Sequence, residues 1–395
     1  MKIALYYPWI YLKSGVERTI LETVKGSKNE YTIFTNHYDQ KGTFPEFGKL
    51  NVIELKKVPV RRDIFSTLKA AITISFQKID LTSFDLFVVH SEGLGDLILF
   101  KNYKIPTICF CDTPLRPVFD IEYKKRAMKK RSIFNRFMYL FFSYIFIAVD
   151  RYLWEKYKYI IFCGKETLKR AKQGNLLNAN SNYEIVHRGV SWDHIKPTGE
   201  YEKYFLVPGR IMWTKNIELA IEAFKKFSLV RTDFKLIIAG MVDKKSVPYY
   251  KTLKNLSGGR KNIKFVINPS DKEMFRLYEN CYTAITTSFN EDWGLTPIEA
   301  NAYGKPVLAV NMGGFKESQV NGKTGFLLNN NPKEFAAKML MLAKNKSLVR
   351  KMGDYARTHS KQFSWNKFVS VFDTRVRAFP DCNNYSRSFP KTQLH

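Results

Sequence analysis

The chain has 395 residues, of which 64 are Lys or Arg and 36 are Asp or Glu, so its formal net charge is +28 at pH 7. This length predicts two or three domains, and 45% hydrophobic residues is typical of a globular protein with a sizeable core. The charge favours polyanionic partners: nucleotide diphosphates, anionic lipid surfaces or nucleic acid. Five cysteines without disulfide or zinc spacing predict a reducing, cytoplasmic setting and no metal site.

Short apolar runs alternate with amphipathic ones through the first half of the chain. The N-terminal MKIALYY has one early Lys and no small-residue cleavage site, which is typical of a first strand rather than a signal peptide. Further buried strands are predicted at 31–36, 84–90, 107–111 and 159–164, and helices at 14–26 and 166–174. This alternation predicts a doubly wound α/β domain.

A basic segment at 124–136 precedes the longest uncharged apolar run, at 137–149. That run has about thirteen residues, fewer than the roughly 20 that a helix needs to span a bilayer, so we do not expect a membrane span. Basic residues followed by aromatic and aliphatic ones are typical of a segment that binds a membrane surface. The residues expected to contact anionic headgroups are Lys124, Lys125, Arg126, Lys129, Lys130, Arg131 and Arg136.

Two other interpretations of this segment stay open. It is also compatible with a buried core helix that follows a solvated basic stretch. Nucleic-acid binding would use the same charge. However, no recognisable nucleic-acid motif is present, and the aromatic residues are bunched rather than interleaved for base stacking. No nucleic-acid partner is therefore expected.

The region near 188–203 is rich in Gly, Pro and charged residues and is predicted to link two domains. After it, strands are predicted at 203–209, 235–240 and 263–268, and helices at 216–228, 249–256 and 272–281. We expect two doubly wound, Rossmann-like α/β domains, at 1–197 and 198–363, that face each other across a ligand-binding cleft. The tail at 381–395 lacks periodicity and is expected to be disordered.

Two acids, Glu291 and Glu299, lie eight positions apart between a predicted buried strand at 281–288 and the next strand at 307–311. Thr296 is predicted to be the N-cap of a short helix between these strands, with Pro at its first position and Glu299 at its third. In open α/β sheets, ligands bind beyond the carboxyl ends of the strands, so both acids are predicted to face one ligand. Alternatively, Glu299 only closes a capping box with Thr296, and Glu291 is a solvated loop acid.

The first strand of the second series leads into Gly209, Arg210 and, five residues later, Lys215. A bidentate guanidinium and a point charge beside helix N-terminal amides form a cradle for a diphosphate. For each residue taken singly, the alternative is an ordinary surface cation. Three further glycines that follow strands are placed either to let backbone amides approach an anion or to form ordinary turns: Gly15, Gly313 and Gly314.

These motifs together resemble retaining glycosyltransferases of family four, which have the GT-B fold. The resemblance covers about residues 1–375 and rests on SGVER, GRIMWTK, EDWGLTPIE and GKPVLAVNMGGFKESQVNGKTGFLL. The segment NEDWGLTPIEANAYGKPV, together with CDTPLR at 111–116, is most similar to the mannosyltransferase-like branch of the family, which builds surface polysaccharides and lipid-linked glycans. By the same resemblance, the last helix, near 364–380, is expected to pack back on the first domain.

The resemblance also implies roles for individual residues. Glu291 is expected to contact the donor sugar and Glu299 the ribose of the nucleotide, while Arg210 and Lys215 hold the diphosphate and stabilise the leaving group. The remaining residues expected to bind the donor are Gly15, Gly209, Gly294, Leu295 and Thr296.

One position departs from the family pattern, because such mannosyltransferases usually have His where this chain has Asp112. Asp112 can accept a hydrogen bond from a sugar hydroxyl, but its charge beside a diphosphate is costly unless Arg116 or Lys215 compensates it. The alternative is that Asp112 is a cap residue at the end of a strand. His90, also at the end of a strand, either lines the cleft or is satisfied locally.

The resemblance predicts transfer of a hexose, with mannose and a GDP-mannose donor favoured, to a glycan or polyprenyl-linked acceptor at the cytoplasmic face of the membrane. No DxD-type carboxylate pair is present to hold Mg²⁺, so a metal-independent reaction with no further cofactor is expected, in which the two cations stabilise the leaving diphosphate. The alternatives are a glucosyl or other UDP-sugar donor and, more remotely, a basic binding protein without catalysis.

Overall fold

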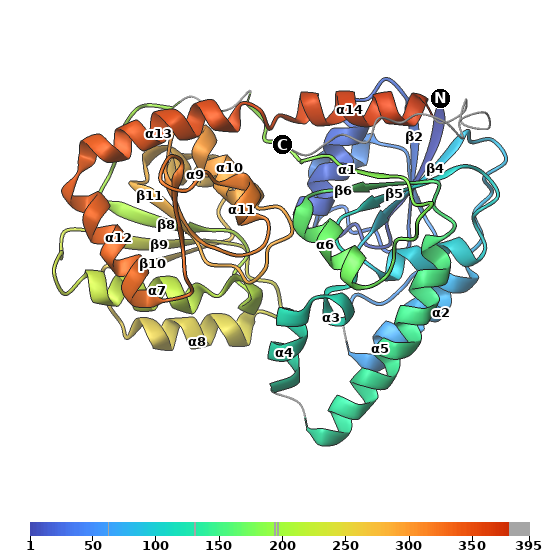
Figure 1. The fold of residues 1–395 in the computed structure, drawn as a ribbon, viewed down its shortest axis with the longest axis horizontal. Coiled ribbons are helices and arrows are strands. Elements are labelled where there is room, and N and C mark those ends of the chain that lie inside the picture. Colours follow the sequence, from blue (N-terminus) through green and yellow to red (C-terminus); the bar gives the residue numbers. More distant parts are fainter. Residues whose placement is uncertain (62, 130–131, 193–194, 196, 379–395) are drawn as a thin grey trace.

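A computed structural model describes residues 1–61, 63–129, 132–192, 195 and 197–378. The chain forms two parallel sheets with helices on their faces, and these sheets lie side by side in Figure 1. Strand order is β3-β2-β1-β4-β5-β6-β7 in the first sheet and β10-β9-β8-β11-β12-β13 in the second. In each sheet the order reverses beside its first strand, as in doubly wound folds. The predicted fold class is confirmed.

The first sheet consists of β1 (Lys2–Tyr6), β2 (Glu30–Thr35), β3 (Val52–Glu54), β4 (Leu86–Ser91), β5 (Thr107–Cys111), β6 (Tyr159–Phe162) and β7 (Tyr183–Ile185). All neighbouring strands pair in parallel. The sequence indicated the five strands that are apolar and buried. It missed the edge strands β3 and β7, which have three residues each and are partly exposed, so they carry no apolar run.

The helical elements of the first domain are α1 (Gly15–Gly26), η1 (Pro45–Lys49), α2 (Ile64–Phe76), η2 (Leu94–Phe100), α3 (Arg116–Phe119), α4 (Ile121–Lys129), α5 (Ile133–Trp154) and α6 (Lys165–Gln173). Side-chain caps determine where several of them begin. The Ser14 hydroxyl accepts from the backbone amide of Val16 at the start of α1, and Asp63 accepts from the amide of Ser66 at the start of α2.

The apolar run at 137–149 belongs to a longer helix than the sequence indicated. Helix α5 has 22 residues with a mean hydropathy of 1.3 in its most apolar window, so by length and composition alone it could cross a membrane. Only 11% of that window is buried in the protein, which contradicts the interpretation as a buried core helix. The helix extends beyond the run at both ends because Ser132 caps it and no helix-breaking residue follows until after Trp154.

The second sheet consists of β8 (Tyr204–Pro208), β9 (Lys235–Gly240), β10 (Ile263–Ile267), β11 (Thr283–Thr286), β12 (Val307–Val310) and β13 (Gly325–Leu328). Around it lie η3 (Trp213–Lys215), α7 (Ile217–Phe227), α8 (Val247–Ser257), α9 (Asp271–Asn280), α10 (Leu295–Ala302), α11 (Phe315–Ser318), α12 (Pro332–Lys344) and α13 (Lys346–Ser360). The strands are mostly buried, as expected for a parallel sheet covered on both faces.

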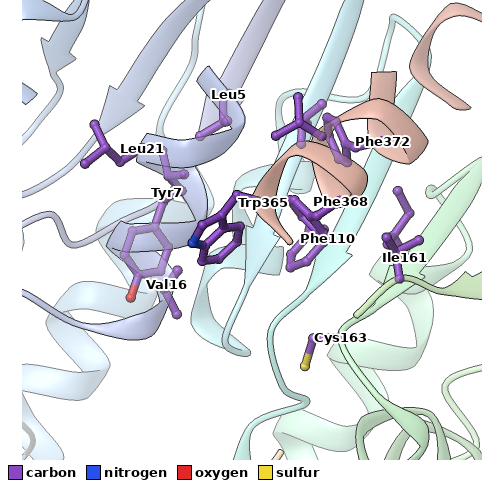
Figure 2. Close-up of a cluster of buried hydrophobic side chains, with 14 of the residues drawn as sticks. Leu5, Tyr7, Val16, Leu21, Phe110, Ile161, Cys163, Trp365, Phe368 and Phe372 are labelled. Carbon is purple, nitrogen blue, oxygen red and sulfur yellow. The ribbon is translucent and has the colours of Figure 1, made fainter. Parts of the chain in front are cut away.

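The last helix, α14 (Trp365–Arg377), returns to the first domain and packs against α1 (Figure 1). Its buried rings meet the first sheet: the ring centroids of Phe368 and Phe372 lie 5.6 and 6.3 Å from that of Phe110 (Figure 2). The same core cluster includes Trp293 of the second domain, so apolar packing joins the two domains. The predicted tail at 381–395 lies outside the described residues.

Candidate active site between the two domains

The loop after β1 of the first sheet and the loop after β11 of the second sheet meet at the domain interface. A Cβ atom added to Gly15, which opens α1, would lie 3.9 Å from Cδ1 of Leu295, the first residue of α10. It would lie at the same distance, 3.9 Å, from Nη1 of Arg188. Gly15 and Leu295 therefore face each other where the carboxyl ends of the two sheets meet, which is the usual position of a ligand in such folds.

Lys215 and Glu291 form the charged pair at the centre of this site. Nζ of Lys215 donates to Oε2 of Glu291 at 2.7 Å, and each side chain keeps 23% of its surface exposed. Burial opposes ionisation of Glu291, but the charge and hydrogen bond of Lys215 outweigh it and lower the pKa of Glu291 to about 2. Glu291 is therefore a carboxylate at neutral pH, and both of its oxygens act only as hydrogen-bond acceptors.

Two hydrogen bonds between the loop after β8 and the loop after β11 position Lys215 and Glu291 relative to each other. The backbone amide of Phe289 donates to the carbonyl of Thr214 at 2.9 Å, and the Thr287 hydroxyl donates to the carbonyl of Lys215 at 2.8 Å. The loop after β8, which carries the cations, is thus tied to the loop after β11, which carries the acid. Lys215 ends η3, one residue before the αL residue that precedes α7, rather than lying in α7 itself.

Arg210 follows Gly209 directly after β8. Gly209 has a φ of 117°, which favours glycine, so the turn that presents Arg210 depends on this residue. The charge of Arg210 acts on Glu17 in the other domain: burial raises the pKa of Glu17 to about 7, and Arg210 is among the groups that lower it. Within the described part of the chain, the guanidinium of Arg210 has no ion pair or hydrogen bond. It is therefore free to contact an anion.

Glu299 lies in α10 and is held by a tyrosine. The Tyr278 hydroxyl donates to Oε2 of Glu299 at 2.9 Å, and burial raises the pKa of Glu299. The predicted capping box with Thr296 is wrong. The helix begins at Leu295 after Gly294, whose φ of 93° is left-handed, and no side chain caps it. Thr296 is consequently the second helical residue, and its predicted donor contact remains a prediction.

The two glycines after β12 support the acid loop. The backbone amide of Gly314 donates to the carbonyl of Glu291 at 2.7 Å, so this amide is already engaged. A Cβ atom on Gly313 would collide with the backbone of Glu291, and one on Gly314 would lie 2.5 Å from Cα of Trp293. The close approach of two loops explains these glycines, whereas the sequence had suggested an anion-binding role or an ordinary turn.

Asp112 is compensated by a different residue from those the sequence suggested. Arg188 donates to Oδ1 of Asp112, and Nδ1 of His90 lies 3.0 Å from Oδ2. All three side chains are buried. Burial and the charge of Arg188 lower the pKa of His90 well below its usual value, so His90 is neutral. Burial lowers the pKa of Arg188 to about 10, which leaves it protonated at neutral pH.

Arg116 and Lys215, the expected partners of Asp112, are occupied elsewhere. Lys215 pairs with Glu291, and Nε of Arg116 donates to Oδ2 of Asp120 at 3.0 Å. Arg188 was missed because it lies in the stretch read as a linker. It follows β7, a three-residue strand without an apolar run, so the sequence held no local signal for it.

A second group of contacts clamps the acid loop from the first domain. Arg116 donates to the carbonyl of Phe289 at 2.8 Å, and the buried Arg170 donates to Oδ1 of Asp292 at 2.5 Å. The Thr113 hydroxyl also donates to Oδ1 of Asp292, at 3.1 Å. An interdomain pocket of about 370 Å³ lies beside this clamp and is lined in part by Arg170 and Gly313. Arg170 and Asp292 were not recognised from the sequence, because each lies in a polar run.

The basic segment is divided between solvent and the second domain. Lys125 and Lys129 on α4 are exposed, and Lys124 is half-buried. Arg126 instead turns to the second domain, with its guanidinium carbon 3.1 Å from the ring centroid of Phe289. Arg136 donates to the carbonyl of Met128 at 3.0 Å. Lys130 and Arg131 lie outside the described residues.

This geometry provides two cations, two acids and a buried polar cluster at the carboxyl ends of two facing sheets. Within the described ranges, no group of three or more His, Cys, Asp and Glu side chains has the arrangement of a metal site. The crystal structure of HepE from Anabaena in complex with UDP and glucose superposes with a TM-score of 0.75, at 16% sequence identity, over 96% of this chain and all of that one. The fold is thus that of the GT-B class of glycosyltransferases.

Sequence comparison identifies the family. Residues 191–359 match the family described as Glycosyl transferases group 1. The chain is 31% identical over 366 residues to the alpha-1,3/1,6-mannosyltransferase ALG2 of Mus musculus, which covers 86% of this chain and 87% of that protein. It is 26% identical over 423 residues to ALG2 of Dictyostelium discoideum, which covers 95% and 98%. The chain belongs to the group 1 glycosyltransferases, family four, as its motifs predicted.

Proposed function

We propose that this protein is a retaining hexosyltransferase that transfers mannose from a nucleotide-diphosphate sugar, with GDP-mannose favoured, to a glycan or polyprenyl-linked acceptor in glycan assembly. The observation that carries this proposal is the Lys215–Glu291 pair in the loops at the domain interface, together with Arg210 on the same loop as Lys215, whose guanidinium has no partner among the described residues. A diphosphate is bound by cationic side chains, and the hydroxyls of a hexose are bound by hydrogen-bond acceptors. The mannosyltransferases among the relatives support the choice of sugar.

The chemistry assigned to these residues is electrostatic. The barrier is set by departure of the nucleoside diphosphate from an oxocarbenium-like carbon, and the guanidinium of Arg210 and the ammonium of Lys215 stabilise the charge that develops on the leaving phosphate. Glu291 is a weaker candidate for a covalent nucleophile, because its carboxylate is held by Lys215 and is assigned to the sugar hydroxyls. The acceptor hydroxyl attacks the face that the diphosphate leaves and gives its proton to the departing phosphate oxygen, and attack from this face retains the configuration.

The same two cations support the proposal of a metal-independent reaction. Arg210 and Lys215 are assigned to neutralise the diphosphate, the task that Mg²⁺ performs in metal-dependent enzymes. Glu299, held by Tyr278, is assigned to the ribose hydroxyls of the donor. Gly15 and Leu295, which face each other across the interface, are assigned to the diphosphate from the two sides.

The Asp112–Arg188 pair bears on the identity of the sugar. Because Arg188 neutralises Asp112, this buried carboxylate adds no net charge beside the diphosphate. A UDP-linked glucosyl donor is the alternative. It is included in the test because the structurally similar HepE was crystallised in complex with UDP and glucose.

A panel of GDP-, UDP- and ADP-sugars tests donor choice. GDP-mannose is expected to raise the melting temperature most, since a ligand that binds only the folded state stabilises it. Transfer from the best binder to lipid-linked and free glycan acceptors is then measured. If no nucleotide sugar shifts the melting temperature, the assignment of a donor site is wrong; if a UDP-sugar gives the largest shift, the mannosyl donor is wrong.

We further propose that the enzyme works at the cytoplasmic face of the membrane as a peripheral protein. The exposed lysines of α4 support this, because anionic headgroups attract nearby basic residues at about 1 kcal/mol each.

A further inference from the structure

Two helices of the first domain present apolar side chains to solvent. On α2 these recur every three to four residues, which places them on one helical face: Ile64, Phe65, Leu68, Ile72 and Phe76. On α5 the corresponding face comprises Ile133, Phe134, Phe137, Leu140, Phe141, Tyr144 and Ile145. The exposed fractions reach 85% for Phe65 and 84% for Ile133. We call these two sets the apolar face.

Both helices pack through their other sides on the same element, η2. The buried residues of α2 include Ala70 and Ile74, and those of α5 include Leu153 and Trp154. Figure 1 shows α2 and α5 on one side of the first domain, where α4 and the start of α5 project away from both sheets. An apolar area of this extent normally marks an interaction site, since it is costly to expose to water.

The surroundings of the apolar face are basic. Helix α4 contributes Lys124, Lys125 and Lys129 next to the start of α5, and the only acid on α4, Glu122, is paired with Lys125 at 3.4 Å. Apolar residues flanked by cations fit the surface of an anionic bilayer. They fit a second copy of this chain less well, because two such basic surfaces would repel each other.

We propose that α5, from Ile133 to Ile145, inserts together with the exposed face of α2 into one leaflet of an anionic membrane, with the lysines of α4 at the headgroups. This rests on the proposed function, because it brings the enzyme to a lipid-linked acceptor. It goes beyond surface attraction by the basic segment, since it assigns the binding energy to apolar residues of two helices.

The depth of insertion follows from where α5 becomes buried. Asp150, Leu153 and Trp154 are in the protein core, so the C-terminal end of the helix stays with the domain. The stretch from Ile133 to Ile145 has 13 residues and is ~20 Å long, shorter than a hydrocarbon core of ~30 Å. Although α5 as a whole is long enough to span, only its first half is available, and it reaches into a single leaflet.

Helix α4 connects the inserted region to the active site. The rings of Tyr123 on α4 and Trp213 on η3 have centroids 4.9 Å apart, and Arg126 lies over Phe289. Trp213 and Phe289 each lie two residues from one member of the Lys215–Glu291 pair. The membrane-binding element therefore leads directly to the edge of the donor site, where the sugar-bearing end of a lipid-linked acceptor would arrive.

Vesicle flotation tests the proposal with the full chain. The wild-type protein is expected to float with phosphatidylglycerol-containing vesicles, and F134S/F137S to lose binding at least tenfold, since each buried Phe contributes substantially to insertion. F65S is expected to weaken binding by a smaller factor, which tests α2. The matched control is L229S/V230S, which removes two exposed apolar side chains from the second domain and should leave binding unchanged.

Three outcomes would overturn the proposal. The first is equal flotation of F134S/F137S and the wild type, and the second is that alkaline carbonate fails to extract the bound protein, which indicates a membrane span. The third is a wild-type protein that binds no vesicles and is a dimer in solution, which F134S/F137S converts to a monomer. The melting-temperature shift with nucleotide sugars is measured on the same variants without vesicles. If a variant keeps the melting-temperature shift with nucleotide sugars but no longer floats with vesicles, membrane insertion is independent of donor binding. If the wild type shows no melting-temperature shift, only the proposed function is contradicted.

Discussion

The guanidinium of Arg188 donates to the carboxylate of Asp112, 76 residues away in the sequence, and both groups are buried at the domain interface. Removing one charge of such a pair is more harmful than removing both, because a single buried charge is left without compensation. The Arg188→Met variant is expected to lose roughly 3–5 kcal/mol of unfolding free energy. The double variant D112N/R188M should recover most of that loss in denaturant titrations. Equal stability of the two variants would show that the pair is not coupled.

Arg210 is expected to act on the transition state. Replacing Arg210 by Ala should raise the activation barrier by about 2–3 kcal/mol and so lower kcat roughly a hundredfold. The variant lacks a hydrogen-bond donor to the charge that develops on the leaving phosphate. The exposed Arg260 of the same domain provides the control, and Arg260→Ala should leave kcat unchanged. Initial rates at saturating donor measure both. A change in KM alone would mean that Arg210 only binds the ground state.

Glu299 is expected to determine nucleotide binding. The Glu299→Ala variant should abolish the melting-temperature shift that the donor produces, since its carboxylate is assigned to the ribose hydroxyls. Tyr278→Phe removes only the hydroxyl that holds Glu299 at 2.9 Å and should reduce the shift without eliminating it. A full shift in Glu299→Ala would place the nucleotide elsewhere.

Metal removal should have no effect on transfer. Because Arg210 and Lys215 are assigned to the diphosphate, the rate in excess EDTA is expected to equal that in Mg²⁺. The comparison is made at constant ionic strength, since charged ligands are sensitive to salt. A rate that falls in EDTA and returns with Mg²⁺ would contradict this assignment.

Two buried acids, Asp96 of η2 and Asp150 of α5, should make stability decrease as pH rises. Burial raises the pKa of Asp96 to about 6 and that of Asp150 well above its usual value. The folded state therefore binds their protons more tightly than the unfolded chain, so the contribution of these two acids to stability is fully present below pH ~4 and is lost as pH rises through the folded values. Asp150→Asn should flatten this dependence and raise the unfolding free energy at pH 8. A slope unchanged by this substitution would exclude the pair as its source.

Much of the fold and of the site could be predicted from the sequence. Buried strands of a parallel sheet are continuous apolar runs, which is why β1, β2, β4, β5 and β6 were recognised, whereas β3 and β7 were not. Glu291, Glu299, Arg210 and Lys215 were found because they follow strands, and residues that follow strands of such sheets meet at one edge.

The sequence by itself thus determined the doubly wound fold and the family, and it indicated the acids and cations proposed to bind the donor, since these depend on local patterns. Only the tertiary structure decided that Arg188 neutralises Asp112 and that Arg170 clamps Asp292, because ion pairs between distant segments have no local signal. It also decided that α10 begins without a capping box and that the apolar half of α5 is uncovered. Whether an apolar helix is buried depends on which elements pack against it, and no periodicity encodes that.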